Sequence, residues 1–556
     1  MKRWQKWMLG IGVVAIGLGV LGYLNRTALI LAYVKHGSAQ EEIAPNREIT
    51  WQQGPAEAEL PPEERPPNIV FILFDDLGIN DLSTFGGGVA GGAVPTPNID
   101  RLAAEGAIFT QAYSGSATCA VSRAQLMTGR YPTRTGFEYT PTRPGFGRVV
   151  AMVGNDIRDD LPPATYDAEA EVGKPDYDDM GLPSEEVTIA EVLREKGYHN
   201  VHIGKWHLGT GDGFHPLDQG FDESLVMTDL MHLPEDDPNV VNAKVDFDPI
   251  DNFLWASGRY GTTFNKSEKF EPGGYLADYW TDQAERVIEN NRNRPFFLYL
   301  AHWGVHTPLQ ATREDYEAVG DIAPHRLRVY AAMVRSLDRS VGRVMAKLEE
   351  QGIADNTIIV ISSDNGGAGY IGLPEVNAPY RGFKITFFEG GIRVPLLARW
   401  PARIAPGTQI DLPAAHVDVM PTLAAVGGGR LPAGVPIDGR NLLPAMTGAG
   451  QMERPDAPLF WNSGYYKVVR AGDWKLQVDG KQDKRWLFDL ANDPTEQVNL
   501  ASRNPEKLAE LEALLAAHHK DRKPALYPTT ADMVTMIDKT LAERFEDGDE
   551  YIYWPN

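Results

Sequence analysis

The chain has 556 residues, of which 43% are hydrophobic, 10% aromatic and 23% charged, a composition typical of a globular protein rather than a disordered one. This length allows a large core with a smaller domain appended. The formal net charge of -23 argues against nucleic acid as a partner, because nucleic-acid binders carry a basic balance. An anionic substrate would therefore need positive charge that is concentrated locally by a metal ion, lysine and arginine.

The N-terminal segment differs from the rest of the chain. Residues 7–24 contain no charged side chain and follow a basic start. As a helix these 18 residues would extend about 27 Å, close to the thickness of the hydrocarbon core of a membrane. We predict a membrane anchor or signal segment over residues 1–39, and prefer an uncleaved anchor to cleavage near residues 37–39. The basic start places the N-terminus in the cytoplasm, so we expect an exported, periplasmic or extracytoplasmic protein, held at the cytoplasmic membrane by residues 7–24.

The middle of the chain has the pattern of an α/β domain. Residues 40–67, rich in proline and glutamate, predict an extended linker. Over residues 68–450, short apolar runs alternate with amphipathic helical stretches, which predicts a large mixed, mostly parallel sheet sandwiched by helices. The predicted strands lie within residues 68–76, 199–209, 295–308, 356–367 and 394–401. The predicted helices include residues 189–197, 277–291 and 326–352.

A smaller C-terminal subdomain and tail are predicted for residues 451–556. Residues 458–490 alternate polar and apolar side chains between glycine turns, which indicates an antiparallel sheet, and residues 505–521 predict a helix that packs on it.

Two long segments, 141–183 and 224–270, are rich in Asp, Pro and Gly and are predicted to be loops. We expect these loops, together with Tyr465 and Tyr466 of the C-terminal sheet, to shape the mouth of a pocket.

Polar side chains follow four of the predicted strands. In open parallel sheets, ligands bind beyond the carboxyl ends of the strands, so these side chains are expected at one edge. Carboxylate and amide oxygens favour Ca²⁺ or Mg²⁺ over Zn²⁺ or Cu²⁺. The four clusters are Asp75 with Asp76, Lys205 with His207, His306, and Asp364 with Asn365.

Cys119 is the only cysteine of the chain. Exported proteins usually pair their cysteines in disulfides, but Cys119 has no second cysteine in its own chain to pair with. It is therefore a buried small residue, a link to another chain, or a chemically special residue.

The stretch "CAVSRAQLMTGRYP" that begins at Cys119 resembles the motif of the formylglycine-dependent sulfatases, which belong to the alkaline-phosphatase-like superfamily. The resemblance covers about residues 66–520, and its specificity comes from several stretches in the same order. These stretches are "PNIVFILFDDLG", "TPNIDRLAAEGAIFTQAY", "CAVSRAQLMTGRYP", "GKWHLG", "HTPLQ", "SSDNGG", "KITFFEGGIRVPLLARWP", "HVDVMPTL" and "GDWKL".

The resemblance implies the alkaline-phosphatase-like fold and hydrolysis of a sulfate monoester, of either an aryl or a carbohydrate alcohol. A maturation enzyme would oxidise Cys119 to formylglycine, an aldehyde that hydrates to a geminal diol. One hydroxyl of the diol would attack sulfur and displace the alcohol, and deprotonation of the other would expel sulfate. The implied partners are a sulfated small molecule or saccharide, the formylglycine-generating maturation enzyme, and a membrane at the N-terminal segment.

The matching positions also imply roles for individual residues. Arg123 would hold the formylglycine and its developing charge, for which a fixed guanidinium is suited. Lys205 would bind sulfate and His207 would be the base for the second hydroxyl, while His306 and Lys384 would contact sulfate and protonate the leaving oxygen. The implied ligands of Ca²⁺, with Mg²⁺ as the alternative, are Asp75, Asp76, Asp364 and Asn365.

Two alternatives stay open from the sequence. A phosphodiesterase or phosphonate monoester hydrolase of the same superfamily would share the fold and metal site. A non-catalytic sulfatase-like binding protein is the alternative of another class, and its only support is Val121, which stands where the family pattern has proline or alanine.

Overall fold

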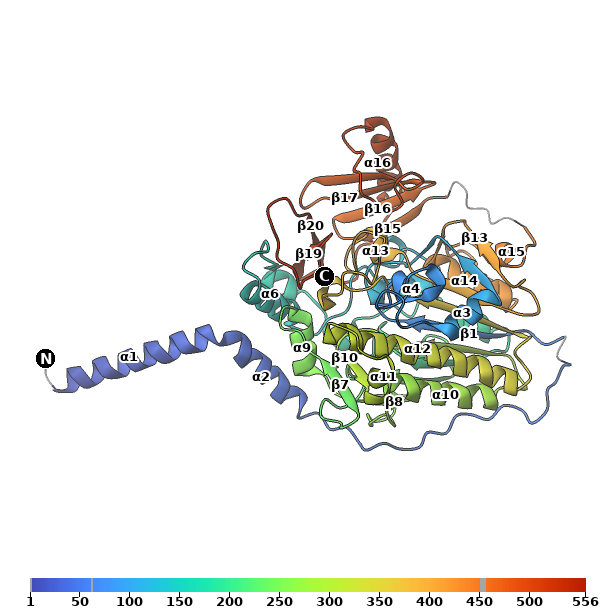
Figure 1. Cartoon of the computed structure of the whole chain (residues 1–556), viewed down its shortest axis with the longest axis horizontal. Coiled ribbons are helices and arrows are strands. Elements are labelled where there is room, and N and C mark those ends of the chain that lie inside the picture. The colour runs from blue at the N-terminus through green and yellow to red at the C-terminus, as the bar shows by residue number, and fades with distance from the viewer. Residues whose placement is uncertain (1–2, 62–63, 451–456) are drawn as a thin grey trace.

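The core of the molecule is a mixed sheet of nine strands within the described residues, which in this computed structural model are 3–61, 64–450 and 457–556. The predicted fold class, a large and mostly parallel sheet sandwiched by helices, is confirmed (Figure 1). In spatial order the strands are β13 (Thr408–Ile410), β2 (Ala107–Phe109), β12 (Leu396–Arg399), β11 (Thr357–Ser363), β1 (Asn68–Phe74), β9 (Phe296–Ala301), β5 (His199–Gly204), β6 (Glu223–Met227) and β8 (Thr262–Phe264).

The central strands end level with one another, and this register positions the site. Strands β11, β1, β9, β5 and β6 are parallel neighbours, whereas β12 and β8 pair antiparallel. Phe74 is opposite Ser363, and Leu73 and Gly204 are both opposite Ala301. The residues that follow β1, β11, β5 and β9 therefore emerge at the same edge of the sheet.

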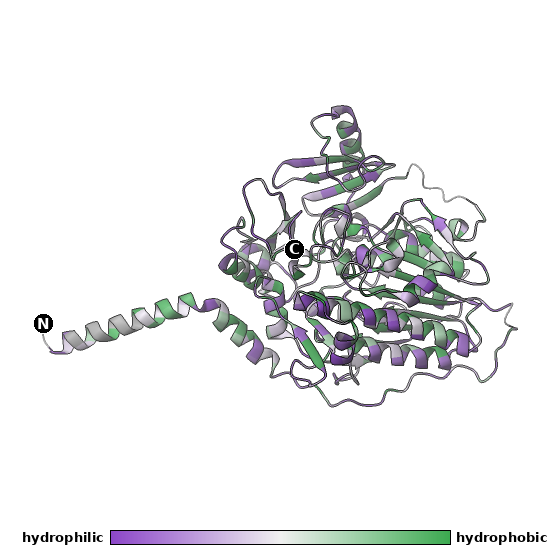
Figure 2. Ribbon diagram, viewed as in Figure 1, coloured by the Kyte–Doolittle hydropathy of each residue, from purple (hydrophilic) through white to green (hydrophobic). Residues whose placement is uncertain are grey.

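Both faces of the sheet are covered, which explains the continuous apolar runs of its strands. Alternate residues of β1 point to opposite faces, so Val70 and Ile72 belong to one apolar cluster and Ile69 and Phe71 to the other. One face packs against α3 (Pro97–Ala104), α10 (Leu276–Asn290) and α12 (His325–Glu350), and the other against α4 (Cys119–Thr128), α8 (Ile189–Arg194) and α14 (Val419–Val426). Figure 2 shows the apolar strands inside and hydrophilic residues along α10 and α12.

A four-stranded antiparallel sheet follows the large sheet in the chain and lies at the top of Figure 1. Its strands are β15 (Leu459–Ser463), β16 (Tyr466–Ala471), β17 (Trp474–Asp479) and β18 (Lys484–Asp489). Helix α16 (Pro505–His519) packs on it through Leu511 and Leu515. The predicted boundary after residue 450 adjoins residues 451–456, which lie outside the described residues.

The two segments predicted as loops also contain regular elements. Residues 141–183 include α6 (Phe146–Ile157), and residues 224–270 include α9 (Pro249–Ser257). Strand β4 (Thr165–Tyr166) joins β19 (Ala531–Met536) and β20 (Tyr551–Pro555) in a three-stranded sheet. The pairing of β4 with β19 joins segments more than 350 residues apart, so local sequence patterns do not predict it.

The remaining elements are short. They are β3 (Ala112–Tyr113), β7 (Val240–Ala243), β10 (Leu309–Thr312), β14 (Ala414–Ala415), α5 (Pro132–Thr135), α7 (Ala168–Val172), α11 (Arg313–Ala318), α13 (Glu389–Ile392), α15 (Leu443–Met446), and the 3₁₀ turns η1 (Ile79–Asp81), η2 (Ser83–Phe85), η3 (Tyr177–Asp179), η4 (Pro216–Asp218), η5 (Gly369–Ile371) and η6 (His416–Asp418).

The N-terminal segment forms two helices, α1 (Arg3–Leu24) and α2 (Arg26–Ser38), and α1 projects away from the body (Figure 1). Among the described residues, no single helix is long and apolar enough to cross a membrane. Residues 16–24 and 26–38 together have the length and composition of a membrane span, but the two helical segments are bent by 73° relative to each other. Within the predicted anchor 7–24, the side chains of residues 9–10 and 12–15 lie outside the described residues.

Part of the predicted linker 40–67 lies against the body. Trp51 is buried and its indole N–H donates a hydrogen bond to Gln283 Oε1 at 3.0 Å. The backbone N–H of Ala44 donates to the carbonyl oxygen of Lys269. The segment from α2 to β1 is thus attached to the body at several points; its residues 62–63 are outside the described part.

Candidate active site

Two neighbouring strands place three carboxylates and an amide at one point. Asp75 and Asp76 follow β1, and Asp364 and Asn365 follow β11; all four side chains are buried. The Asp76 backbone N–H donates to Asp364 Oδ1 at 3.3 Å, and Asn365 Nδ2 donates to Asp76 Oδ1 at 2.8 Å. Asp76 has a φ of 59°, an unusual conformation for a residue with a β-carbon. Asn365 Oδ1 is buried without a hydrogen-bond partner in the described residues.

Cys119 lies against these carboxylates. It is the first residue of α4, a helix in which every residue is buried. Its thiol lies 3.5 Å from Asp75 Oδ1 and 3.8 Å from Asp76 Oδ1, and Lys384 Nζ lies 3.1 Å from its sulfur. Burial and the negative charges of Asp364 and Asp75 raise the pKa of the thiol. The polar surroundings differ from those of a small apolar residue in the core.

Arg123, one helical turn after Cys119, connects three strands of the sheet. Its side chain is fully buried. Nε donates to Asp364 Oδ2 at 2.9 Å, and Nη2 donates to Asp75 Oδ2 at 2.8 Å. Nη1 donates to the carbonyl oxygen of Lys205 at 2.7 Å, at the end of β5. This guanidinium fixes the carboxyl ends of β1, β5 and β11 relative to one another.

Two lysines balance the remaining carboxylate charge. Lys205 Nζ lies 2.6 Å from Asp75 Oδ2 and 4.6 Å from the centre of the Trp303 ring. Lys384 Nζ lies 2.6 Å and 2.9 Å from the two oxygens of Asp76. Burial opposes the charged form of Lys384, but the carboxylate of Asp76 outweighs it and holds the pKa of Lys384 well above its usual value.

The two aspartates after β1 experience different environments. Burial and the neighbouring charge of Asp364 raise the pKa of Asp75 to about 6. Burial also acts on Asp76, but the positive charge of Lys384 and the contact with His306 outweigh it, and the pKa of Asp76 is lowered.

The two predicted site histidines differ in their contacts with this centre. His306 Nε2 lies 3.6 Å from Asp76 Oδ2, its Nδ1–H donates to the carbonyl oxygen of Thr307 at 2.6 Å, and its ring stacks on Trp303. His207 has a φ of 64°, and within the described part of the chain no hydrogen bond or ion pair joins it to the other predicted site residues. Burial, followed by the charge of Lys205, lowers the pKa of His207, so its imidazole is neutral.

The donor set suits a hard divalent cation. Ligand atoms of Asp75, Asp76, Cys119 and His306 all lie within 4.8 Å of one another. This group shares the two aspartates with the predicted ligand set. Asp364 Oδ1 accepts the backbone N–H of Asp76, and Asn365 turns its Nδ2 toward Asp76 Oδ1, so rotation of this amide would bring its unpartnered oxygen to the group. Oxygen donors in this number fit Ca²⁺ or Mg²⁺ better than softer metals.

Sequence reasoning missed three residues that support this site. Tyr370 donates its hydroxyl to Asp76 Oδ2 at 2.9 Å, and Trp303 lies beneath Lys205 and His306. His416 hydrogen-bonds Ser122 Oγ and Ser362 Oγ, both at 2.9 Å, and so connects α4 to β11. Tyr370 lies in no motif, whereas His416 lies within "HVDVMPTL" and could have been found from that stretch.

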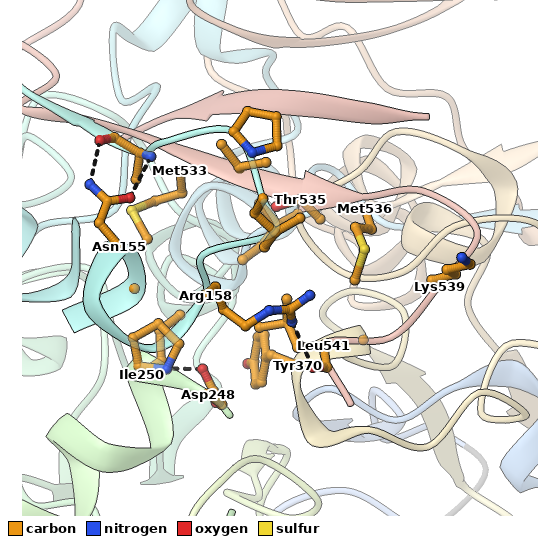
Figure 3. A pocket seen from close by; sticks show the side chains of 18 of the residues that line it. Asn155, Arg158, Asp248, Ile250, Tyr370, Met533, Thr535, Met536, Lys539 and Leu541 are labelled. Carbon is orange, nitrogen blue, oxygen red and sulfur yellow. Dashed lines mark hydrogen bonds between the residues drawn. The ribbon is translucent and has the colours of Figure 1, made fainter. Parts of the chain in front are cut away.

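A cavity with about 780 Å³ of space, part of it open to solvent, lies beside Tyr370 (Figure 3), and Lys384 also lines it. It is lined by parts of both predicted loop segments, 141–183 and 224–270, and by β19. Tyr466, expected at the pocket mouth, is instead fully buried in the C-terminal sheet. Tyr465 donates its hydroxyl to Asp532 and does not line this cavity. We call this space the apolar cavity, for the side chains that line most of it.

A doubly covered α/β sheet with acids, a cysteine, lysines and histidines gathered at the carboxyl ends of its strands defines a hydrolase of the alkaline-phosphatase-like class. The family model described as Sulfatase matches residues 67–429, and a model described as N-sulphoglucosamine sulphohydrolase, C-terminal, matches residues 382–522.

Relatives with known names agree with these models. The chain is 35% identical over 420 residues to N-acetylgalactosamine-6-sulfatase of Canis lupus familiaris, which covers 74% of this chain and 71% of that protein. It is 29% identical over 571 residues to steryl-sulfatase of Mus musculus, which covers 84% of each. The crystal structure of Ps i-CgsB in complex with k-i-k-neocarrahexaose superposes with a TM-score of 0.69 at 28% identity, over 83% of this chain and 95% of that one. The chain belongs to the sulfatase family and is a sulfuric ester hydrolase.

Proposed function

We propose that this chain hydrolyses a sulfate monoester with a formylglycine formed from Cys119, at a Ca²⁺ site made by Asp75, Asp76, Asp364 and Asn365. One observation carries the proposal: the sulfur of Cys119 lies 3.5 Å from Asp75 Oδ1 and 3.1 Å from Lys384 Nζ, at the edge where two strands deliver their carboxylates. A cysteine kept only for packing would be surrounded by hydrocarbon.

The two groups absent from the polypeptide supply distinct chemistry. Formylglycine supplies a hydrated aldehyde, with one hydroxyl to attack sulfur and another whose deprotonation releases sulfate. Ca²⁺, when bound, supplies Lewis-acid stabilisation of negative charge. Mg²⁺ is the alternative ion, since the same oxygen donors suit it.

The cationic side chains bind and orient the substrate. Lys205 and Lys384 neutralise Asp75 and Asp76 here, and a divalent ion on those carboxylates would leave both ammonium groups to bind sulfate oxygens. Arg123 holds Asp75 and Asp364 in place and adds positive charge behind Cys119.

The histidines move protons. Because Nδ1–H of His306 is committed to the carbonyl oxygen of Thr307, Nε2 is the atom that faces the centre. Burial lowers the pKa of His306 well below its usual value, so Nε2 has to take up a proton before it can deliver one to the leaving oxygen; Lys384, which stays charged, is the other proton donor. His207, held neutral by burial, accepts a proton from the second hydroxyl during release of sulfate.

The proposed biological setting follows from the N-terminal segment and the modification. We propose an exported protein whose segment 1–39 attaches it to the cytoplasmic membrane, and a partner enzyme that oxidises Cys119 despite Val121 in the motif. The relatives named above include proteins named for sulfated sugars and for steryl sulfates, so the substrate is a sulfate ester of one of these two kinds of alcohol.

The decisive experiment is mass spectrometry of the tryptic peptide 102–123 after co-expression with a formylglycine-generating enzyme. Conversion of Cys119 lowers the peptide mass by about 18 Da. Complete retention of the thiol would refute the proposal. Parallel assays with 4-nitrophenyl sulfate, a phosphodiester and a phosphonate ester test the reaction; preference for either phosphorus substrate would support the alternative hydrolase activity.

A further inference from the structure

The apolar cavity adjoins the candidate active site, and none of the proposed catalytic steps uses it. About 780 Å³ of space, part of it open to solvent, lies between its lining residues. Lys384 and Tyr370 line it at one end, and both contact Asp76. Lys384 also contacts the sulfur of Cys119. Lys384 and Tyr370 are thus shared by the candidate site and the cavity, and we place the alcohol portion of a substrate whose sulfate lies at Cys119 in this space.

Three separate segments give the cavity an apolar wall (Figure 3). Leu161 and Pro162 follow α6, Ile250 lies in the first turn of α9, and Met533 and Met536 lie on β19. Methionine side chains are flexible and polarizable, so they adapt to apolar ligands of different outline. The wall thus favours a hydrocarbon surface over one covered by hydroxyl groups.

The polar side chains that reach the cavity are largely occupied by the protein itself. Asn155 exchanges two hydrogen bonds with the backbone of Ala164, and Arg158 binds Asp160 and the carbonyl oxygen of Leu541. Asp248 accepts two backbone N–H bonds at the start of α9. A buried saccharide needs hydrogen-bond partners for several hydroxyl groups. Because the polar groups of this wall are already paired within the protein, the cavity disfavours binding of a saccharide.

We propose that the leaving alcohol of the natural substrate is an extended apolar body, either fused rings or an alkyl chain, that is held in the apolar cavity. The substrate is then a sulfated amphiphile rather than a sulfated saccharide. This inference rests on the proposed function, since it uses the site at Cys119 as the position of the sulfate.

The start of α2 is attached beside the same cavity, and the apolar helix α1 projects away from that point (Figure 1). Arg26 Nε and Thr27 Oγ1, at the start of α2, donate to Asp156 Oδ2 of α6 at 3.0 Å and 2.7 Å. Asp156 directly follows the lining residue Asn155. Helix α1, which ends at Leu24, exposes apolar side chains such as Trp7 and Ile16.

A series of 4-alkylphenyl sulfates, from methyl to hexyl, tests the proposal with the full-length protein. The reacting bond stays the same along the series while the tail grows. Each methylene that enters the apolar cavity is expected to raise kcat/KM by about fourfold, until the cavity is filled. N-acetylgalactosamine 6-sulfate is expected to be a poorer substrate than any member. Turnover of the methyl compound with no dependence on tail length would overturn the inference and leave the proposed function intact.

Two variants test whether the dependence of kcat/KM on tail length arises in the apolar cavity. Met533→Gln and Ile250→Gln keep the size of the side chain close to the original and add a polar group to the wall. Each is expected to lower the ratio of kcat/KM for the hexyl over the methyl compound by about tenfold. Val498→Gln, at an exposed position outside the cavity, is the matched control and should leave the ratio unchanged. An unchanged ratio in both cavity variants would refute the assignment.

Calorimetric binding provides a readout that does not need turnover. 4-Hexylphenol is expected to bind the purified protein at least tenfold more tightly than 4-methylphenol, and N-acetylgalactosamine should show no binding at the same concentrations. Tail-dependent binding without turnover of any sulfate would refute the proposed function but support the cavity assignment. Equal binding of both phenols would refute the assignment, whatever the activity.

Discussion

Replacement of Arg123 by lysine tests how the site is held together. The guanidinium is fully buried and makes three hydrogen bonds of 2.7 to 2.9 Å, to Asp364, Asp75 and the carbonyl oxygen of Lys205. A lysine ammonium keeps the charge but cannot reach three acceptors in a fixed planar arrangement. At least one of the charge-assisted hydrogen bonds to Asp75 and Asp364 is lost, and the affected carboxylate keeps only its contact with Lys205 or with the backbone N–H of Asp76.

We expect Arg123→Lys to lower the free energy of unfolding by about 3–5 kcal/mol, the range for breaking a buried ion pair. Urea denaturation followed by tryptophan fluorescence measures this loss. Arg134→Lys is the matched control, because the ion pair of Arg134 with Asp438 spans 2.7 Å at a side chain that is 41% exposed. Exposed pairs of this kind contribute less than about 1 kcal/mol. Equal losses in the two variants would show that Arg123 does not hold the strand ends together.

Three further predictions follow from the same region. Burial raises the pKa of Asp81 to about 7, so the native state retains a proton that the unfolded chain releases near pH 4, and stability should fall by up to about 4 kcal/mol as pH rises from 4 to 7. Asp81→Asn should flatten that decline in denaturation midpoints measured across this range, and an unchanged slope would assign it to other groups. Asp364→Asn should abolish the rise in melting temperature produced by Ca²⁺ in the wild type; a retained rise would remove Asp364 from the ligand set. Chelation with EDTA should stop hydrolysis of 4-nitrophenyl sulfate, with recovery on adding Ca²⁺, and activity that persists in EDTA would contradict a required cation.

Much of the large sheet could be predicted from local patterns. The continuous apolar run of β1 and the acids after it mark a buried strand and its end, and the predicted helix over residues 189–197 contains α8. These features depend on neighbours within a few residues. The convergence of Asp75 and Asp364 on one point could be inferred because parallel strands share an edge.

Other features depend on contacts between distant segments. Helices α6 and α9 lie in stretches whose Asp, Pro and Gly content suggested loops, because their stability comes from packing rather than from composition. Strand β19 lines the apolar cavity from a tail with no readable pattern, and Tyr370 reaches Asp76 from a loop outside every motif. The positions of these segments depend on three-dimensional contacts, so they cannot be predicted from local sequence patterns.

The burial of α4 determines whether Cys119 can be modified before or after the chain has folded. Cys119 is 4% exposed in a helix whose every residue is covered, so the folded molecule offers no access to the active site of another protein. The oxidation of Cys119 that we propose must then precede the packing of this helix, and the two processes compete in time. A chain that folds quickly, or is made faster than its partner can act, would be trapped as a stable but inactive thiol form.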